Sequence, residues 1–395
     1  MKKGLLGNIK DAFLAFASGV VLFLVATCLL YGNEENYFND MQFIKSVDGS
    51  VVDVTERVSP EGGDSPESSR GADFSDLDGA AVYGSAVASV GGPVVDPVTG
   101  VSCDCLVLKR CVSYYQWKES SHTETDSDGN ERRVYSYSKC WTSSPVDSSR
   151  FKRSGHENSV FLRLPDLRFE ADDAKMGVAR LSKKAIELLD PSEKKDLGLS
   201  RGRLDSLAGG LAVSKSKVHD SGGFLYFGAN PNRPEIGDVR VSYKYYPCSR
   251  YSFICQFKGS ELCPLDNHGK PFFRIERGEV TKDDLISHAR SDAKWSLWGF
   301  RIFYMLLVFA ACCMILSPIC RITEPIPIVG GVVRLGVTLA ALAVSIPWSL
   351  VVIAFSWFRF RPMAAALILF AALAIYAVVS NLSGRGKGRR TASDC

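Results

Sequence analysis

Apolar residues gather in four stretches, one near the start of the chain and three near its end. The stretches that lack charged side chains are Ala12–Tyr31, Ile302–Ile319, Leu335–Phe358 and Met363–Val379. An α-helix rises about 1.5 Å per residue, so runs of this length can cross the roughly 30 Å of hydrocarbon in a bilayer. We therefore predict four transmembrane α-helices, which cover residues 12–31, 297–319, 330–357 and 362–382.

The first apolar run follows Lys2, Lys3 and Lys10, as the core of a cleaved signal peptide would. It is longer than the ~7–15 apolar residues of such a core, and no small-residue cleavage site follows it. We interpret the run as an uncleaved signal anchor.

Two arginines separate the third and fourth runs, in the stretch SWFRFRP at residues 356–362. A charge at the centre of a bilayer costs at least ~2.5–3.5 kcal/mol, and one helix over both runs would exceed what tilting accommodates. We predict a hairpin at the membrane surface at residues 358–361, with interface anchors at Trp357, Arg359 and Arg361. A charged site inside the membrane is the weaker alternative.

Residues 32–296, between the first and second helices, mix charged, aromatic and β-branched side chains. Residues 59–79 are rich in Ser, Gly and Asp, and they hold too few apolar side chains to offset the entropy of ordering, so we predict a flexible loop there. The runs Cys105–Glu119 and Arg132–Trp141 predict two strands of a hairpin around the turn signal TDSDGN.

Further strand-like runs lie between residues 224 and 280. Amphipathic spacing predicts helices at Lys175–Leu189 and Lys282–Lys294, the second of which leads into a transmembrane helix. The region as a whole predicts a large α+β domain rich in antiparallel strands.

Lys and Arg are more frequent near the membrane on one side of this arrangement than on the other. That side holds the N-terminal residues 1–11, the loop 320–329 and the basic tail 383–395, and we predict that it is cytoplasmic. The large domain and the hairpin at 358–361 are then lumenal.

An oxidising lumen would change the chemistry of the cysteines in the domain. There are seven of them: Cys103, Cys105, Cys111, Cys140, Cys248, Cys255 and Cys263. They can form up to three disulfides, whose connectivity the sequence does not give. A zinc site at Cys103 and Cys105 is the alternative, but no C-x-x-C or histidine pair completes it. We predict no metal and no cofactor.

Catalytic motifs are missing from the sequence. It holds no phosphate-binding Gly-rich loop, no G-x-S-x-G and no H-E-x-x-H, and its histidines are scattered. His156 and Glu157 are neighbours in GHEN, which favours a loop contact over an acid–base pair. A cluster of aromatic residues is a candidate pocket lining, although cross-strand pairing explains it more simply: Tyr114, Tyr115, Trp117, Tyr135, Tyr137 and Trp141.

Small residues occur among the bulky ones of the third helix, at Gly331, Gly336 and Ala340. Membrane helices gain no hydrophobic energy by meeting, so small residues that allow close approach favour contact. We predict that these positions pack against other helices, within the chain or in a second copy.

The order of several motifs is similar to that of the transmembrane protein 43 (LUMA) family. These motifs are NEENYF, DPVTGVS, LKRCVSYYQWKE, YSYSKCW, GHEN, NPNRPEIGDVRVSY, IPIVGG and WFRFRP. The resemblance covers nearly the whole chain. It implies a multi-pass protein of the endoplasmic reticulum and inner nuclear membrane that self-associates and helps to organise nuclear-envelope proteins such as emerin and lamins. It implies no catalytic residue.

Together these features predict a non-enzymatic membrane scaffold that contacts lipids and its own copies and binds no nucleic acid. Two alternatives are a lumenal domain that handles a lipid or another ligand, and a component of a channel or transporter. The second alternative calls for polar side chains within the transmembrane helices, where they are nearly absent.

Overall fold

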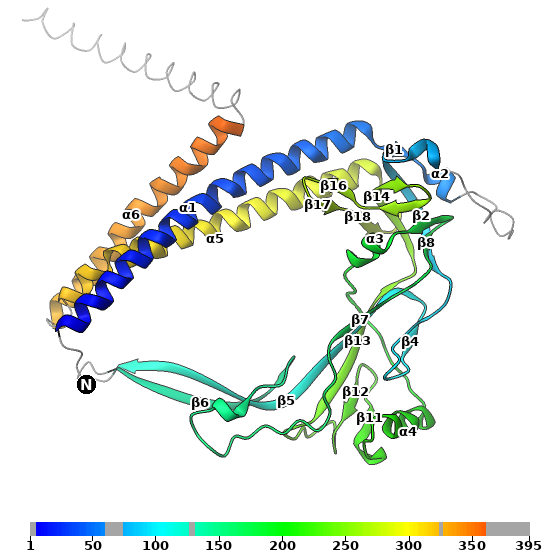
Figure 1. Ribbon diagram of the computed structural model, residues 1–395, viewed down its shortest axis with the longest axis horizontal. Coiled ribbons are helices and arrows are strands. Elements are labelled where there is room, and N and C mark those ends of the chain that lie inside the picture. Colours follow the sequence, from blue (N-terminus) through cyan, green and yellow to red (C-terminus); the bar gives the residue numbers. More distant parts are fainter. Residues whose placement is uncertain (1–4, 60–73, 126–130, 324–326, 361–395) are drawn as a thin grey trace, which may run out of the picture. The chain divides into compact units, whose positions relative to one another are not determined.

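The computed structural model describes residues 5–59, 74–125, 131–323 and 327–360 (Figure 1). The chain divides into two compact units, a helical unit of residues 1–49 and 286–395 and a strand-rich unit of residues 50–285.

Three long helices form the described part of the helical unit: α1 (Leu5–Ser50), α5 (Lys282–Thr323) and α6 (Pro327–Phe360). Each contains a segment long and apolar enough to cross a membrane, at Ala12–Ser50, Lys282–Cys320 and Gly331–Arg359. Helices are thereby confirmed at three of the four predicted spans. The predicted fourth span, residues 362–382, lies outside the described residues, as do Arg361 and the basic tail.

Helices α1 and α5 continue well beyond their apolar runs. Helix α1 passes Tyr31 without a break and ends at Ser50, and α5 already begins at Lys282. The predicted helix at Lys282–Lys294 is therefore the first part of α5. Residues 32–49 also belong to the helical unit and not to the strand-rich one.

Small side chains let the three helices approach one another closely. A Cβ atom on Gly19 of α1 would lie 2.8 Å from the backbone nitrogen of Ile315 on α5. Ala26, Val308 and Ala341, one from each helix, are fully buried in a shared apolar cluster. Further along α1, Trp348 Nε1 of α6 donates a hydrogen bond to Thr27 Oγ1 at 3.1 Å. Close backbone approach of this kind is how membrane helices gain packing energy.

The first sheet of the strand-rich unit closes on itself. Strand β2 pairs with β8, β8 with β9, β9 with β15, β15 with β14, and β14 again with β2. Strands β1 and β18 extend it beside β2 and β14. The bounds are β1 Val52–Asp53, β2 Ala81–Val90, β8 Ala174–Met176, β9 Ala179–Leu181, β14 Arg250–Lys258, β15 Glu261–Cys263 and β18 Arg274–Arg277.

The second sheet has the order β11-β12-β13-β5-β6, with β10 beside β13 and β7 beside β5. Its strands are β5 Cys105–Thr125, β6 Glu131–Thr142, β7 Leu167–Glu170, β10 Glu193–Lys194, β11 Val218–Asp220, β12 Leu225–Phe227 and β13 Val239–Pro247. Two small ladders pair β3 (Val94–Val95) with β4 (Ser102–Cys103) and β16 (Leu265–Asn267) with β17 (Lys270–Phe272). The short helices are α2 Thr55–Val58, α3 Lys183–Glu187 and α4 Arg201–Gly210.

The predicted hairpin is confirmed, because β5 and β6 pair in an unbroken antiparallel register from Tyr114↔Thr142 to Thr125↔Glu131. Its turn, residues 126–130, lies outside the described residues, and so does most of the Ser/Gly/Asp-rich stretch, residues 60–73. The strand-like runs between 224 and 280 are also strands.

The predicted helix at Lys175–Leu189 is wrong. The segment forms the hairpin of β8 and β9 and then the short helix α3. Met176 pairs with Ala179, so Gly177 opens a two-residue turn, and it adopts a φ of +59° that glycine accepts readily. A Cβ atom there would also lie 1.7 Å from the carbonyl oxygen of Val58.

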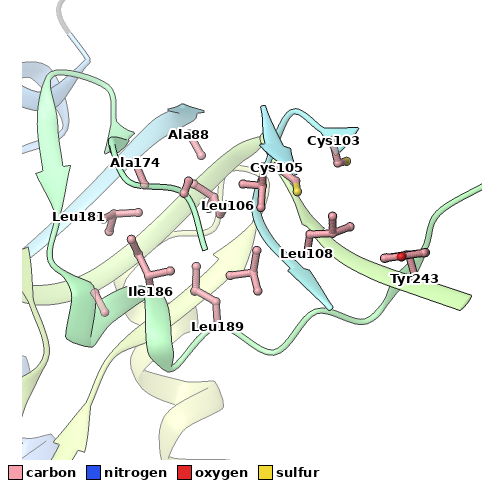
Figure 2. Packing of buried hydrophobic residues seen from close by; sticks show 14 of the residues in the cluster. Ala88, Cys103, Cys105, Leu106, Leu108, Ala174, Leu181, Ile186, Leu189 and Tyr243 are labelled. Atoms are coloured by element: carbon pink, nitrogen blue, oxygen red, sulfur yellow. The ribbon is translucent and has the colours of Figure 1, made fainter. Parts of the chain in front are cut away.

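One hydrophobic core serves both sheets (Figure 2). Leu106 and Leu108 of β5 are fully buried, and they pack with residues from β2, β8, β9 and α3. Figure 2 labels members of this cluster from those elements: Ala88, Ala174, Leu181 and Ile186. The first four residues of β5, Cys105–Leu108, are all fully buried, and this continuous apolar run anchors the second sheet on the first.

Candidate functional site

A buried ion pair joins α1 to α5 where their apolar runs end. The guanidinium of Arg301 donates from Nε to Glu34 Oε1 at 2.5 Å and from Nη2 to Glu34 Oε2 at 2.7 Å. Glu34 is 4% exposed and Arg301 6%. A bidentate ion pair of this kind fixes the relative orientation of the two side chains as well as their distance, because the planar guanidinium matches the carboxylate.

Aromatic side chains from α5 and α6 surround the Glu34–Arg301 ion pair, and together these residues form a junction between the three helices. The indole Nε1 of Trp357 on α6 donates to Glu34 Oε2 at 3.3 Å. The guanidinium carbon of Arg301 lies 4.8 Å from the ring centre of Trp298, a cation–π contact. All three helices therefore meet at the Glu34 carboxylate.

The junction has the same position in each helix relative to its apolar run. Glu34 follows the run that ends at Tyr31, Arg301 precedes the run that starts at Ile302, and Trp357 lies at the end of the run before Arg359. Charged and Trp side chains at such boundaries are typical of the membrane–water interface.

A cavity of about 200 Å³ opens beside the ion pair. Helix α5 contributes side chains at helical spacing along one face, and α1 and α6 supply the remaining walls. The lining residues are Glu34, Tyr37, Phe38, Lys294, Leu297, Trp298, Arg301, Ser356 and Trp357.

The sequence prediction found only one residue of this site. Trp357 was predicted as an interface anchor, and its indole nitrogen bonds to Glu34. Arg359 is exposed near the end of α6, and Arg361 lies outside the described residues. Glu34 and Arg301 were not predicted, because a charge next to an apolar run resembles an ordinary helix flank. Opposite charges at the same end of two antiparallel helices are the signal that could have revealed them.

The predicted helix-packing residues are exposed in the described part of the chain. Gly331, Gly336 and Ala340 are exposed, and a Cβ atom on either glycine would meet nothing within 4 Å. The face of α6 that packs within the chain is a different one. It carries the buried residues Ala341, Ser345, Ser349, Val352 and Ser356.

The seven cysteines of the strand-rich unit are free thiols in the structure, so their pairing stays a prediction. Cys103 and Cys105 lie close enough for a thiol–thiol hydrogen bond. That bond from Cys105, with the nearby Lys195 charge, lowers the pKa of Cys103 to about 7. The same bond and burial raise the pKa of Cys105. In the described residues no group of three or more His, Cys, Asp or Glu side chains is placed to hold a metal ion.

Two of the six residues in the predicted aromatic cluster pair with each other across the β5–β6 hairpin, and the other four lie opposite residues that are not aromatic. Tyr115 lies opposite Trp141 with ring centres 5.2 Å apart. His156 stacks on Tyr137 at 3.9 Å, and Glu157 accepts a bond from the backbone N–H of Gly155. GHEN is thus a loop whose histidine packs on the hairpin.

A second buried ion pair lies in the core of the strand-rich unit. Arg110 Nη1 donates to both carboxylate oxygens of Asp96 at 3.0 and 2.9 Å, and the hydroxyl of Tyr243 donates to Asp96 at 2.6 Å. Arg110 Nε also donates to the carbonyl oxygen of Pro165 at 3.1 Å. The network ties β5, β13 and the loop after β3 together, which is a structural task.

These features define a membrane protein with several apolar helices and a strand-rich domain. The family model described as Transmembrane protein 43 matches residues 114–362, so the chain belongs to that family. The resemblance drawn from the motifs is thereby confirmed.

Curated relatives carry the same description. The mouse Transmembrane protein 43 is 25% identical over 295 residues, 69% of each chain, and the human protein is 26% identical over 293 residues, 70% of each chain. The Drosophila melanogaster Transmembrane protein 43 homolog is 23% identical over 381 residues, 91% of this chain and 92% of its own length. No solved structure matches the chain.

Proposed function

We propose that this protein is a non-enzymatic membrane scaffold of the endoplasmic reticulum and inner nuclear membrane. It organises nuclear-envelope protein complexes through self-association and through its strand-rich domain, which lies in the lumen. The observation that carries the proposal is the face of α6 opposite its packing face, which is exposed and made of small residues.

The two faces of α6 differ in their side chains, because the packed face carries three serines and the exposed face carries small apolar residues. The exposed small-residue face is defined by Gly336, Ala340, Ala343, Pro347 and Ala354, at spacings of four, three, four and seven residues. These spacings keep the residues on one side of a helix. Small residues let a second membrane helix approach closely, so this face supports self-association.

The β5–β6 hairpin supports contact with other proteins. Beyond Trp117 its outer part carries exposed side chains on both faces, from Ser120 to Glu124 on β5 and at Arg132 and Arg133 on β6. Among the described residues, β5 from Lys118 to Thr125 pairs only with β6. An open strand edge of this kind can take an added strand from a partner. By the family resemblance, we propose emerin-like proteins, and lamins where the host has them, as partners of the protein as a whole and not of this hairpin in particular.

Self-association tests the proposal through α6. Replacing Gly336 and Ala340 together by leucine should fill the exposed small-residue face and reduce co-precipitation of two differently tagged copies by about tenfold. Gly331→Leu is the matched control, because at about 100° per residue it lies on another side of α6. If copies of the double variant co-precipitate as well as copies of the parent, self-association must depend on the strand-rich domain and not on this face of α6.

The lumenal placement has its own test. Protease added to sealed microsomes should remove short tails and leave residues 32–296 intact until detergent is added. Digestion of that segment in sealed vesicles would invert the proposed orientation.

A further inference from the structure

We propose that the cavity beside the Glu34–Arg301 pair binds the headgroup of a phospholipid through its phosphodiester, with Lys294 and Arg301 as the cationic contacts. This ligand is independent of the scaffold proposal, since it concerns lipid and not protein partners.

The charges that line the cavity favour an anion. The Glu34 carboxylate already accepts two hydrogen bonds from Arg301 and one from the indole N–H of Trp357. Lys294 and Arg301 lie seven residues apart, on the same face of α5, and both line the cavity. One carboxylate against two cations leaves a surplus positive charge, which matches the single negative charge of a phosphodiester.

Hydrogen-bond donors remain for this ligand. Arg301 uses Nε and Nη2 on Glu34, and among the described residues its Nη1 makes no hydrogen bond. Lys294 is exposed and forms no ion pair in the described part of the chain. A phosphate oxygen between these two groups would receive charge-assisted bonds, the stronger kind of hydrogen bond.

The size of the cavity fits a headgroup and not a whole lipid. Its volume of about 200 Å³ is below the ~300–1,000 Å³ of pockets that enclose drug-sized molecules. The acyl chains would lie outside, along the apolar surface that begins directly after Arg301. On that surface Ile302, Phe303 and Leu306 are each more than half exposed.

The position of the cavity favours a lipid over free phosphate. The apolar runs of three helices end at this level, and the rings of Trp298 and Trp357 stand beside the cations. Tryptophan is enriched where headgroups meet hydrocarbon. The acyl chains of a phospholipid anchor the molecule in the bilayer, so its phosphodiester is concentrated at this depth. Free phosphate is not anchored and stays dilute there.

The test uses the full-length protein purified in detergent and stripped of lipid. Binding of phosphatidylglycerol is measured by native mass spectrometry and by the rise in melting temperature, with diacylglycerol and inorganic phosphate as comparison ligands. Lys294→Gln should weaken phosphatidylglycerol binding about tenfold, which is the loss of one charged hydrogen bond. Lys45→Gln on α1 makes the same charge change at an exposed position outside the cavity lining and should bind like the parent.

Each outcome decides the proposal. Binding of phosphatidylglycerol that Lys294→Gln weakens and Lys45→Gln does not, with no response to diacylglycerol, supports it. Equal binding by parent and Lys294→Gln overturns it, provided that both melt at the same temperature without lipid. A response to millimolar inorganic phosphate as large as that to phosphatidylglycerol overturns the assignment to a lipid. Co-precipitation of Lys294→Gln copies, measured in parallel, keeps this result separate from the scaffold proposal.

Discussion

Each unit of the molecule buries an arginine against a carboxylate, and the two pairs differ in their surroundings. In the strand-rich unit, Arg110 and Asp96 are 1% and 0% exposed, and they lie within the core that both sheets share. In the helical unit, Arg301 and Glu34 are nearly as buried, but they line a cavity that also contains Lys294. Both carboxylates accept an additional bond from an aromatic donor, Tyr243 in one case and Trp357 in the other.

The different surroundings indicate that the same kind of ion pair has two roles, a purely structural one in the strand-rich unit and one beside a candidate ligand site in the helical unit. A buried ion pair contributes little net stability, because desolvation offsets the attraction, yet removing one partner is costly. In the strand-rich unit the pair holds together segments that are distant in sequence. In the helical unit it also holds three helices together, but the neighbouring space and the extra cation leave room for a ligand. The comparison therefore predicts unequal responses to the same substitution.

The largest effect is expected for Arg110→Met. It leaves the Asp96 carboxylate buried without its cation, which should cost about 3–5 kcal/mol in the free energy of unfolding. Amide hydrogen exchange of the full-length protein, read on peptides from β13, measures this as a loss of protection of a hundredfold or more. Arg180→Met is the control, since its ion pair with Asp173 is largely exposed and should contribute no more than ~1 kcal/mol. Similar losses for both variants would contradict the role assigned to the Asp96 network.

A smaller effect is expected for Arg301→Met in the helical unit. The Glu34 carboxylate loses its cation but lies beside a cavity that water can enter, so we expect a loss of about 2 kcal/mol. Exchange of α1 peptides around Glu34 is the measurement. Adding Glu34→Gln to Arg301→Met should recover part of the loss, because no uncompensated charge then remains.

The control for this second experiment lies on the same two helices. Arg290 donates to Asp48 at 2.7 Å, and both side chains are about one-third exposed or more. Arg290→Met should therefore change protection less than Arg301→Met. An equal or larger loss of protection in Arg290→Met would mean that the Glu34–Arg301 pair contributes no more to stability than a partly exposed pair does.

The elements that the sequence predicted correctly are those with a strong and unambiguous period. The apolar runs gave three helices, and the alternating β-branched and aromatic residues of Cys105–Glu119 and Arg132–Trp141 gave the hairpin. The segment Lys175–Leu189 failed because Val178, Leu181, Ala185 and Leu188 have a helical spacing that a short hairpin followed by a helix also satisfies. Tertiary contacts distinguish the two, since β8 pairs with β2, β9 pairs with β15 and Gly177 lies against Val58.

The candidate site was harder to predict, because it depends on how helices face one another. Charges at 34 and 301 are far apart in sequence. Hydropathy locates the part of a helix that can cross a membrane, but it gives neither the full length of the helix nor its rotation. The small residues of α6 show the same limit. The sequence identified Gly336 and Ala340, but the buried face is formed by Ala341 and the serines at positions 345, 349 and 356. A shift of one residue turns a helix by about 100°, which moves a side chain from the packed face to the exposed one.

The smallest effect that we predict is a pH dependence confined to the strand-rich pair. Burial alone would raise the pKa of Asp96, but the bonds from the Tyr243 hydroxyl and the Val98 N–H, together with the Arg110 charge, outweigh it and hold the pKa below its ordinary value. A carboxyl group with a lowered pKa in the folded state stabilises the protein above its unfolded-state pKa of about 3.9, and this contribution is lost as the pH falls through the folded-state value. The contribution of Asp96 to the protection of β13 amides from hydrogen exchange should therefore be constant between pH 7 and 5. It should decrease below about pH 4. Asp96→Asn lowers protection at every pH and should remove this acid-dependent part. The same acid slope in Asp96→Asn and in the parent would assign it to other carboxyl groups.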